Sequence, residues 1–141
     1  MSHQAIETYR GFVYPWVIDH IGHMNVQSYT GRFDEASWYF LAHLGLTPGF
    51  LKENSRGLVA LDQRIQYKLE VLAGSLLDIR TGLLEVKTKT LRYVHTMRNS
   101  ETGGEVANTE LLIAFIDTIA RKTVALPDEV HSRAQLIFGR S

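Results

Sequence analysis

The sequence predicts an α+β domain in which one antiparallel sheet wraps around a long central helix. The helix is predicted from residues 25–44, which present one apolar face. Four segments that alternate like strands follow between residues 59 and 118, and their short connections favour antiparallel pairing. An amphipathic helix has to bury its apolar face, and the single predicted sheet is the partner available for it.

The first strand is expected over residues 4–14, where apolar and polar side chains alternate loosely before Pro15. With the four later segments it brings the sheet to five strands. In the helix that follows, apolar residues recur at the three- or four-residue spacing that places them on one face. These residues are Tyr29, Phe33, Ala36, Phe40, Leu41 and Leu44.

Both ends of the helix carry suitable capping residues. Asn25 is a favourable N-cap, because its side-chain oxygen can accept a hydrogen bond from a backbone N–H two or three positions on. Gly45 suits the left-handed position beyond the last turn, and Leu46 is expected to pack back against the helix. Pro48 is expected to keep the helix from resuming, so residues 45–57 are predicted to be a loop.

The clearest strand covers residues 59–71. Apolar side chains occupy its odd positions and polar ones its even positions, and only Gln63 interrupts the apolar face. A turn at residues 73–75 leads to a strand over 76–86, whose apolar phase shifts at Leu83-Leu84. One inserted residue would produce that shift, so we expect a β-bulge there.

The last two strands and a C-terminal helix follow from similar patterns. Residues 91–98 alternate again, and the turn that contains Gly103-Gly104 predicts a hairpin. Residues 106–118 are apolar on both faces, which predicts a central, buried strand. A short helix is expected from Pro127, which suits the first helical position.

Composition restricts the classes of function. A chain of 141 residues without internal repeats is expected to form one domain, residues 1–141. Lys plus Arg equals Asp plus Glu at 15 each, so no net charge draws the chain to nucleic acid or to a membrane surface. The absence of cysteine excludes thiol catalysis and thiolate metal sites. With no signal-like leader and no apolar run approaching about 18 residues, we expect a cytoplasmic protein.

The residues that carry chemistry concentrate in Asp19-His20-Ile21-Gly22-His23-Met24-Asn25, directly before the helix. A helix N-terminus presents backbone N–H groups without partners and the positive end of the helix dipole. A loop that brings a carboxylate to such a terminus suits a reaction in which an oxyanion develops.

This stretch, followed by Tyr29 and by Phe33-Asp34-Glu35-Ala36, resembles the Asp-x-x-Gly-His-(Val/Met)-Asn…Tyr…Phe-x-x-Ala motif of hotdog-fold acyl-CoA thioesterases. The nearest group is that of 4-hydroxybenzoyl-CoA thioesterase. Over nearly the whole chain, the resemblance implies the hotdog fold, a five-stranded antiparallel sheet wrapped around a long central helix. The sequence departs from the motif at Val26, where many members carry a second Asn.

The resemblance also implies a function and a site. The reaction is hydrolysis of an acyl-CoA thioester to a free acid and coenzyme A, without a cofactor or a metal, in a homodimer or homotetramer. The aspartate of the loop, Asp19, is the nucleophile or general base, and a backbone N–H at the helix start polarises the thioester carbonyl. The predicted substrate-binding residues are Gly22, His23, Asn25, Val26, Tyr29 and Arg92.

Several of these residues have plainer roles as alternatives. Asp19 can stabilise a turn with its side chain, and His23 can orient the loop by hydrogen bonding. Arg92, near a strand junction, can protect a solvated strand edge instead of binding a phosphate. Asp19, His20 and His23 also suggest a metal site, but ligands packed so closely in sequence give poor coordination geometry.

Two other functions remain as alternatives. A dehydratase on the same fold would need an Asp/His pair spaced for removal of an α-proton, and the short spacing of Asp19 and His23 disfavours it. A non-catalytic acyl-CoA-binding module would fit the same residues. Four aromatic residues would suit a cage for a quaternary ammonium group, although we expect them to pack in the core: Tyr14, Trp16, Trp38 and Tyr39.

Overall fold

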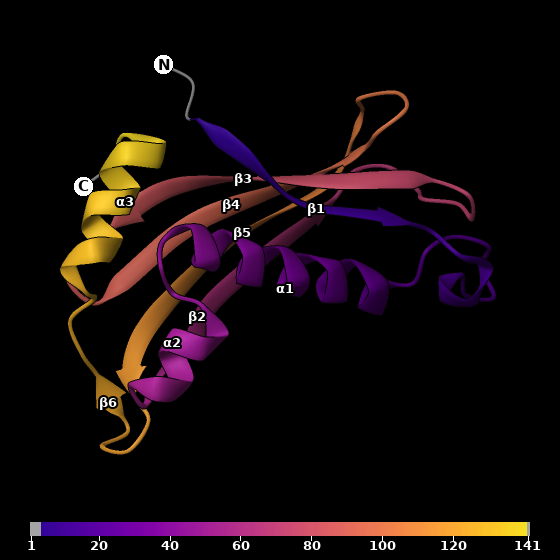
Figure 1. Cartoon of the computed structure of the whole chain (residues 1–141). Helices are drawn as coiled ribbons and strands as arrows, with labels where there is room; N and C mark the ends of the chain where they lie inside the picture. The colour runs from indigo at the N-terminus through magenta and orange to yellow at the C-terminus, as the bar shows by residue number, and fades with distance from the viewer. Residues whose placement is uncertain (1–3, 141) are drawn as a thin grey trace.

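The structure, a computed structural model, describes residues 4–140 and confirms the predicted α+β class. Figure 1 shows the sheet curving over α1, with α3 at one end of it. In chain order the elements are β1 (Ala5–Phe12), a 3₁₀ turn (Pro15–Val17), α1 (Val26–His43), α2 (Pro48–Glu53), β2 (Arg56–Tyr67), β3 (Leu76–Val86), β4 (Thr90–Asn99), β5 (Glu105–Asp117), β6 (Lys122–Thr123) and α3 (Asp128–Phe138).

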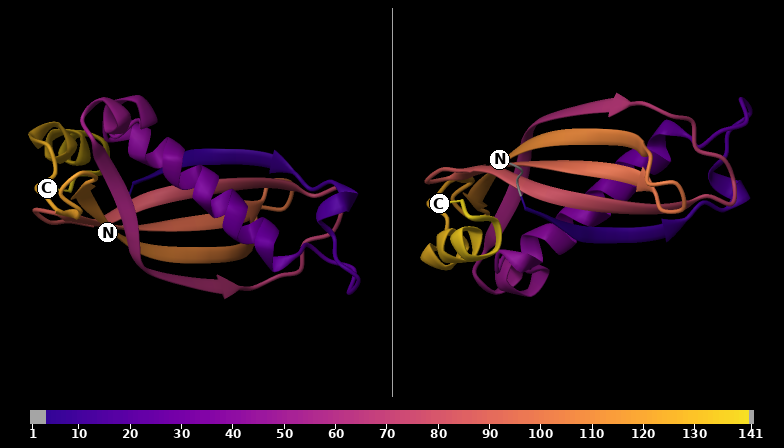
Figure 2. Two further views of the ribbon diagram at one scale, coloured as in Figure 1. Left: turned by 90° about the horizontal axis from the view of Figure 1, so that it is seen from below. Right: turned by 90° about the horizontal axis from the view of Figure 1, so that it is seen from above.

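The long strands form one antiparallel sheet in the order β1-β3-β4-β5-β2, and the two-residue β6 pairs with β5. β1 and β2 are therefore the opposite edges of this sheet. Helix α1 runs obliquely across one face, as Figure 2 shows from below, and among the strands it lies closest to β1 and β3. The β2 edge is consequently covered less well than the β1 edge.

The predicted ends of α1 are confirmed. The Asn25 side chain caps the helix by accepting a hydrogen bond from the Gln27 N–H. At the other end Gly45 has a φ of +89°, and the Leu46 N–H donates to the Leu41 carbonyl at 2.9 Å. Leu41 and Leu46 are both buried, so the chain folds back onto the helix as expected.

The prediction of a structureless loop over residues 45–57 is wrong. Helix α2 occupies its middle, with Thr47 as the N-cap accepting from the Phe50 N–H at 3.1 Å. Pro48 occupies the first turn of this helix, where its missing N–H costs nothing and its fixed φ favours a helical start. Pro48 thus begins a second helix where we expected it only to prevent the first from resuming.

Strand β2 corrects the prediction of one continuous apolar face over residues 59–71. It ends at Tyr67, and a bulge between Ala60 and Asp62 shifts its register against β5. The odd positions therefore face opposite sides of the sheet before and after the bulge. Because β2 is also the less covered edge, most of the predicted apolar face is exposed: Val59, Leu61, Tyr67 and Leu69.

Other predictions for the second half of the chain are confirmed. The register of β3 against β4 shifts between Leu83 and Glu85, as the phase change at Leu83-Leu84 predicted. β5 lies between β4 and β2, and both of its faces carry buried residues. Helix α3 begins at Asp128, with Pro127 one position earlier than expected, at the N-cap.

A chain of polar side chains crosses the apolar core between the sheet and α1. His95 of β4 is 0% exposed; its Nε2 lies 2.8 Å from Ser37 Oγ of α1, and its Nδ1 lies 2.6 Å from Thr81 Oγ1 of β3. Beyond these, Tyr93 donates to Ser37 at 3.0 Å and Thr81 contacts Thr8 of β1 at 2.8 Å. The chain links three strands to the helix, and among the described residues no buried side-chain polar atom lacks a partner.

Burial lowers the pKa of His95 to about 3, so its imidazole is neutral in the folded protein. The unfolded chain has an ordinary histidine pKa of about 6.5 and binds more protons below it, so stability should fall as the pH is lowered from about 6.5 towards 3. The His95 contribution to this loss should be about 2 kcal/mol in the free energy of unfolding at pH 5 relative to pH 7. Urea denaturation at both values of pH measures it.

The variant His95→Gln should lose this contribution, whereas His131→Gln, on α3, should keep it. If His95→Gln does not fold, NMR titration of the parent provides the second measurement, and the His95 ring should show no protonation down to pH 5. Protonation of that ring near pH 6, or an unchanged pH dependence in His95→Gln, would contradict the neutral buried imidazole.

Candidate active site

The loop before α1 is a tight hairpin closed by an isolated bridge between Ile18 and Met24. The Gly22 N–H donates to the Asp19 carbonyl at 3.0 Å, and the Asp19 N–H donates to the His23 carbonyl at 3.1 Å. Gly22 has a φ of +103°, a conformation that side-chain-bearing residues rarely adopt. The glycine therefore shapes the turn that presents Asp19.

Two backbone hydrogen bonds fix this loop to the rest of the fold. The Asn25 N–H donates to the Val17 carbonyl at 2.9 Å, and the Met24 N–H donates to the Val71 carbonyl at 2.7 Å. Met24 is itself buried. The loop is thus held on one side by the segment before it and on the other by the segment that follows β2.

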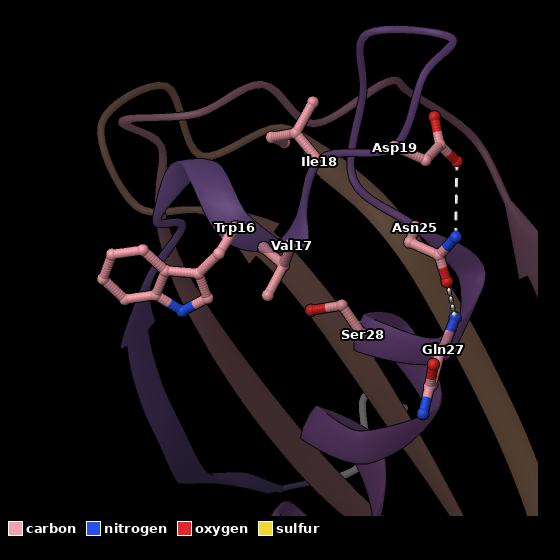
Figure 3. A pocket seen from close by; sticks show the side chains of 7 residues that line it. All are labelled: Trp16, Val17, Ile18, Asp19, Asn25, Gln27 and Ser28. Carbon is pink, nitrogen blue, oxygen red and sulfur yellow. Dashed lines mark hydrogen bonds between the residues drawn. The ribbon is translucent and has the colours of Figure 1, made fainter.

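Asp19 uses its two carboxylate oxygens differently. Oδ1 accepts from the Ile21 N–H at 2.9 Å, which is the turn-stabilising role considered from the sequence. Oδ2 accepts from Asn25 Nδ2 at 3.4 Å, while Asn25 Oδ1 caps Gln27 at 2.9 Å (Figure 3). Asn25 therefore joins the carboxylate to the start of the helix, and the long bond leaves Oδ2 less engaged than Oδ1.

The helix start offers one free backbone donor beside this carboxylate. The Gln27 N–H is taken by the Asn25 side chain and the Ser28 N–H donates to the Asn25 carbonyl at 2.9 Å. Val26 is the first helical residue, so its N–H has no intrahelical acceptor, and within residues 4–140 no other hydrogen bond engages it. This N–H, at the positive end of the helix dipole, is free to bind an anion.

Two pockets flank the loop and the helix start. The first, here the acid pocket, has a volume of about 280 Å³ and is lined by Trp16, Val17, Ile18, Asp19, Asn25, Gln27 and Ser28 (Figure 3). The second, here the tyrosine pocket, has a volume of about 260 Å³ and is lined by His23, Met24, Val26, Tyr29, Tyr67, Lys68, Leu69 and Glu70.

The predicted site residues divide between these pockets. Asp19 and Asn25 line the acid pocket, whereas His23, Val26 and Tyr29 line the tyrosine pocket. The two pockets therefore meet at the helix start, at the peptide link between Asn25 and Val26. Gly22 lies at the exposed tip of the loop and lines neither pocket.

Tyr67 and Glu70 are site candidates that the sequence analysis assigned only to the two faces of a strand. The Tyr67 ring packs edge-on against Tyr29, with centroids 5.1 Å apart and an interplanar angle of 87°. The pKa of Tyr29 is raised chiefly by burial and further by the nearby Tyr67 and Glu70. The contact spans 38 positions in sequence, and the alternation continues past Tyr67 to Val71, so no local signal marks this segment.

The four aromatic residues expected in the core lie on the surface, so that prediction is wrong. Trp16 is 77% exposed and stacks on Tyr14, with ring centroids 4.5 Å apart and planes 4° from parallel. Trp38 and Tyr39, both on α1, are exposed as well. Trp16 alone of the four lines either pocket beside the loop, so they do not form one cage there.

Arg92 lies apart from the other predicted site residues. On β4 it pairs with Glu110 at 3.0 Å and with Glu85 at 3.8 Å. Along β3, Glu85 is nine residues from Leu76, which pairs with the end of β1 before the loop. At about 3.3 Å per strand residue this places Arg92 roughly 30 Å from that end of the sheet. A single chain does not bring it to the loop, and its predicted role would need a second chain.

Two further observations concern a metal site and a membrane-spanning helix. Within residues 4–140, no group of three or more His, Asp or Glu side chains is arranged to hold a metal ion. In the same part of the chain, no helix has the length and apolar character needed to span a membrane.

Comparisons with known proteins agree with the predicted family and fold. The family model described as "Thioesterase-like superfamily" matches residues 13–134. A relative from Agrobacterium fabrum, named L-carnitine dehydrogenase/betainyl-CoA thioesterase, is 34% identical over 112 residues, which cover 79% of this chain but 22% of that protein. The chain thus spans about a fifth of its length. A betainyl-CoA thioesterase from Pseudomonas aeruginosa is 25% identical over 95% of this chain and 84% of its own.

Solved structures share the fold at low sequence identity. A Staphylococcus aureus protein solved in complex with CoA has a TM-score of 0.89 at 19% identity, covering 99% of this chain and 87% of its own. A 1,4-dihydroxy-2-naphthoyl-CoA thioesterase from Synechocystis has a TM-score of 0.80 at 15% identity, covering 92% and 95%. The predicted hotdog fold is therefore confirmed.

Removing the Asn25 side chain should destabilise the protein through the loss of the helix cap. We expect Asn25→Ala to lower the free energy of unfolding by about 1 kcal/mol, measured by urea denaturation, because the Gln27 N–H loses its acceptor. Thr47→Ala, which removes the N-cap of α2, is a matched control and should cost a similar amount. An Asn25→Ala variant as stable as the parent would show that the cap contributes nothing.

Proposed function

The chain belongs to the thioesterase-like superfamily, and from this we propose that it hydrolyses an acyl-CoA thioester to a carboxylic acid and free coenzyme A. One observation carries the proposal: a half-buried carboxylate, Asp19, is tied through Asn25 to a helix start whose Val26 N–H is free. Thioester hydrolysis needs both a base or nucleophile and a donor for the developing oxyanion.

The Val26 N–H serves as the oxyanion donor in this proposal. The thioester carbonyl oxygen accepts from it, and the bond strengthens as the oxygen becomes negative in the tetrahedral intermediate. The helix dipole adds to the effect. Because Asn25 already caps Gln27, the cap organises the first turn and leaves the Val26 N–H for the substrate.

Asp19 serves as general base or as nucleophile. As a base it takes a proton from water while the water oxygen bonds to the carbonyl carbon; the intermediate then collapses, the C–S bond breaks and the coenzyme A thiolate takes up the proton. As a nucleophile, a carboxylate oxygen of Asp19 attacks the same carbon, expels the thiolate and forms a mixed anhydride that water cleaves. In both routes Asn25 holds the carboxylate in place.

The remaining predicted residues take supporting roles. Gly22 permits the tight turn, His23 and Tyr29 line the wall that the acyl group meets, and Arg92 binds a coenzyme A phosphate where a second chain brings it near. The dehydratase alternative gains no support, because Asp19 and His23 line different pockets and their side chains form no hydrogen bond with each other.

A thiol-release assay over a panel of acyl-CoA thioesters tests the proposal. Betainyl-CoA leads the panel, because two relatives are named for that substrate. Release of coenzyme A supports hydrolysis. Hydration of an enoyl-CoA without thiol release would identify a dehydratase, and binding without turnover would identify a carrier module.

We further propose that the active protein is a homodimer or a dimer of dimers. The β2 edge exposes unpaired backbone groups beside the apolar side chains of Val59 and Leu61. Such an edge normally needs cover. A second copy that pairs along β2 would cover it, and it would also lie beside Tyr67, at the end of the same strand.

The substitution Asp19→Asn should lower turnover about 100-fold or more, the scale typical of losing a positioned base or nucleophile. Asparagine keeps the acceptor for the Ile21 N–H, so the thermal midpoint should change little. Asp117→Asn is the matched control, because Asp117 supports the turn after β5 in the same way, through the Ile119 N–H at 2.8 Å. Near-parental turnover of Asp19→Asn would make the carboxylate structural and refute this mechanism.

Sedimentation at micromolar concentration should show a dimer or tetramer. Leu61→Lys places a charge on the β2 edge and should reduce the assembly and the activity together. Leu136→Lys changes an even more exposed apolar residue, on α3, and should leave both unchanged. A parental protein that is monomeric and fully active would contradict the proposal that the active protein is a homodimer or a dimer of dimers.

A further inference from the structure

The tyrosine pocket combines two aromatic rings with one carboxylate beside the Val26 N–H. Tyr29 comes from α1, Tyr67 ends β2, and Glu70 follows three residues later. The Tyr29 hydroxyl has no hydrogen-bond partner among the described residues, where no fully buried side-chain polar atom lacks one. The hydroxyl oxygen is therefore not fully buried, and it reaches the open space of the pocket. At about 260 Å³ the pocket has room for a group of several heavy atoms, since one water occupies roughly 30 Å³.

The charged groups at this pocket sum to one negative charge when Glu105, the ion-pair partner of Lys68, is counted with the lining. Glu70 makes no hydrogen bond or ion pair within residues 4–140, although it lies near enough to Tyr29 to raise the pKa of its phenol. Lys68, the cation in the lining, has its Nζ 3.9 Å from the carboxylate of Glu105. Lys68 and Glu105 offset each other, so the carboxylate of Glu70 is uncompensated.

Backbone hydrogen bonds hold the segment that carries Tyr67 and Glu70 in place. The N–H groups of Lys68 and Leu69 both donate to the Val106 carbonyl, at 2.9 and 3.3 Å. One residue beyond Glu70, the Val71 carbonyl accepts from Met24 of the loop. The segment from Tyr67 to Val71 is therefore fixed to β5 and to the loop, although it lies outside a strand.

We propose that the tyrosine pocket holds the acyl group and that Glu70, with the rings of Tyr29 and Tyr67, selects acyl groups that carry a quaternary ammonium. The assignment rests on the proposed hydrolysis, because it places the thioester carbonyl at the Val26 N–H. Val26 lines the same pocket, so the head group can lie only a few bonds from the carbonyl. Short acyl chains are therefore expected.

The lining suits a quaternary ammonium better than a primary one. An alkylated nitrogen has no N–H to donate and is weakly hydrated, and it gains from the negative faces of aromatic rings. A carboxylate at some distance supplies attraction without requiring a hydrogen bond. A neutral acyl group of the same shape would gain neither the attraction to Glu70 nor the contact between a cation and the ring faces.

Two thioesters that differ in one atom test the inference. Trimethylammonioacetyl-CoA carries the cation, and 3,3-dimethylbutanoyl-CoA has carbon in place of nitrogen. For the full-length parent, kcat/KM should favour the cationic thioester, and Glu70→Gln should lower kcat/KM for it about tenfold while changing the neutral one less than about twofold. Tyr67→Leu should reduce the preference and Tyr67→Phe should retain it.

Glu53→Gln, on α2, is the matched control and should leave both values unchanged. The same comparison is made for binding, by calorimetry with thioether analogues in which a methylene replaces the carbonyl. Hydrolysis of both thioesters with no Glu70-dependent preference would overturn the inference and leave the proposed function standing. Glu70-dependent preference in binding without hydrolysis of any thioester would support the pocket assignment and overturn the proposed function.

Discussion

The hydrogen bond between Ser37 and His95 determines how α1 sits on the sheet. Ser37 interrupts the apolar side of the helix, and a buried hydroxyl must find a partner. The bond between Ser37 and His95 belongs to a directional series of hydrogen bonds. Tyr93 donates to Ser37, Ser37 donates to Nε2 of His95, and Nδ1–H of His95 donates to Thr81. Thr81 then donates to Thr8, which donates to the Ile79 carbonyl. This order requires a neutral imidazole, because a protonated ring would leave Ser37 without its acceptor. The series therefore fixes one axial position of the helix.

This axial position of α1 determines where the Val26 N–H lies relative to Asp19. Val26 lies eleven residues before Ser37, about 16 Å along the helix, so an axial slip would move the free N–H away from Asp19. The loop cannot shift along with the helix, because backbone hydrogen bonds join Asn25 to Val17 and Met24 to Val71. A buried network away from the loop thus holds the Val26 N–H and the Asp19 carboxylate, the proposed oxyanion donor and base or nucleophile, in register.

Local signals in the sequence predicted the helix, its caps, the bulge in β3 and the loop with Asp19, because each depends on residues close together in the chain. Helix α2 was missed although Thr47 and Pro48 are a local signal for a helix start. The other failures are non-local. Whether Trp16 or Leu61 is buried depends on which sheet edge α1 covers, and the alternation in β2 does not reveal that edge. The Tyr29–Tyr67 contact and the position of Glu70 likewise arise only when β2 ends beside the start of α1.

The division into two pockets has a chemical consequence. A quaternary ammonium close to the thioester carbonyl itself stabilises the oxyanion that forms there, and a carboxylate in direct contact with the ammonium would reduce that benefit. Glu70 instead lines the tyrosine pocket, whereas Asp19, the proposed base or nucleophile, lines the acid pocket across the helix start. In the proposed complex the cation would lie between Glu70 and the developing oxyanion, with Val26 at the junction of the two pockets. Binding can then use the attraction between Glu70 and the cation, and catalysis can use the attraction between the same cation and the developing oxyanion.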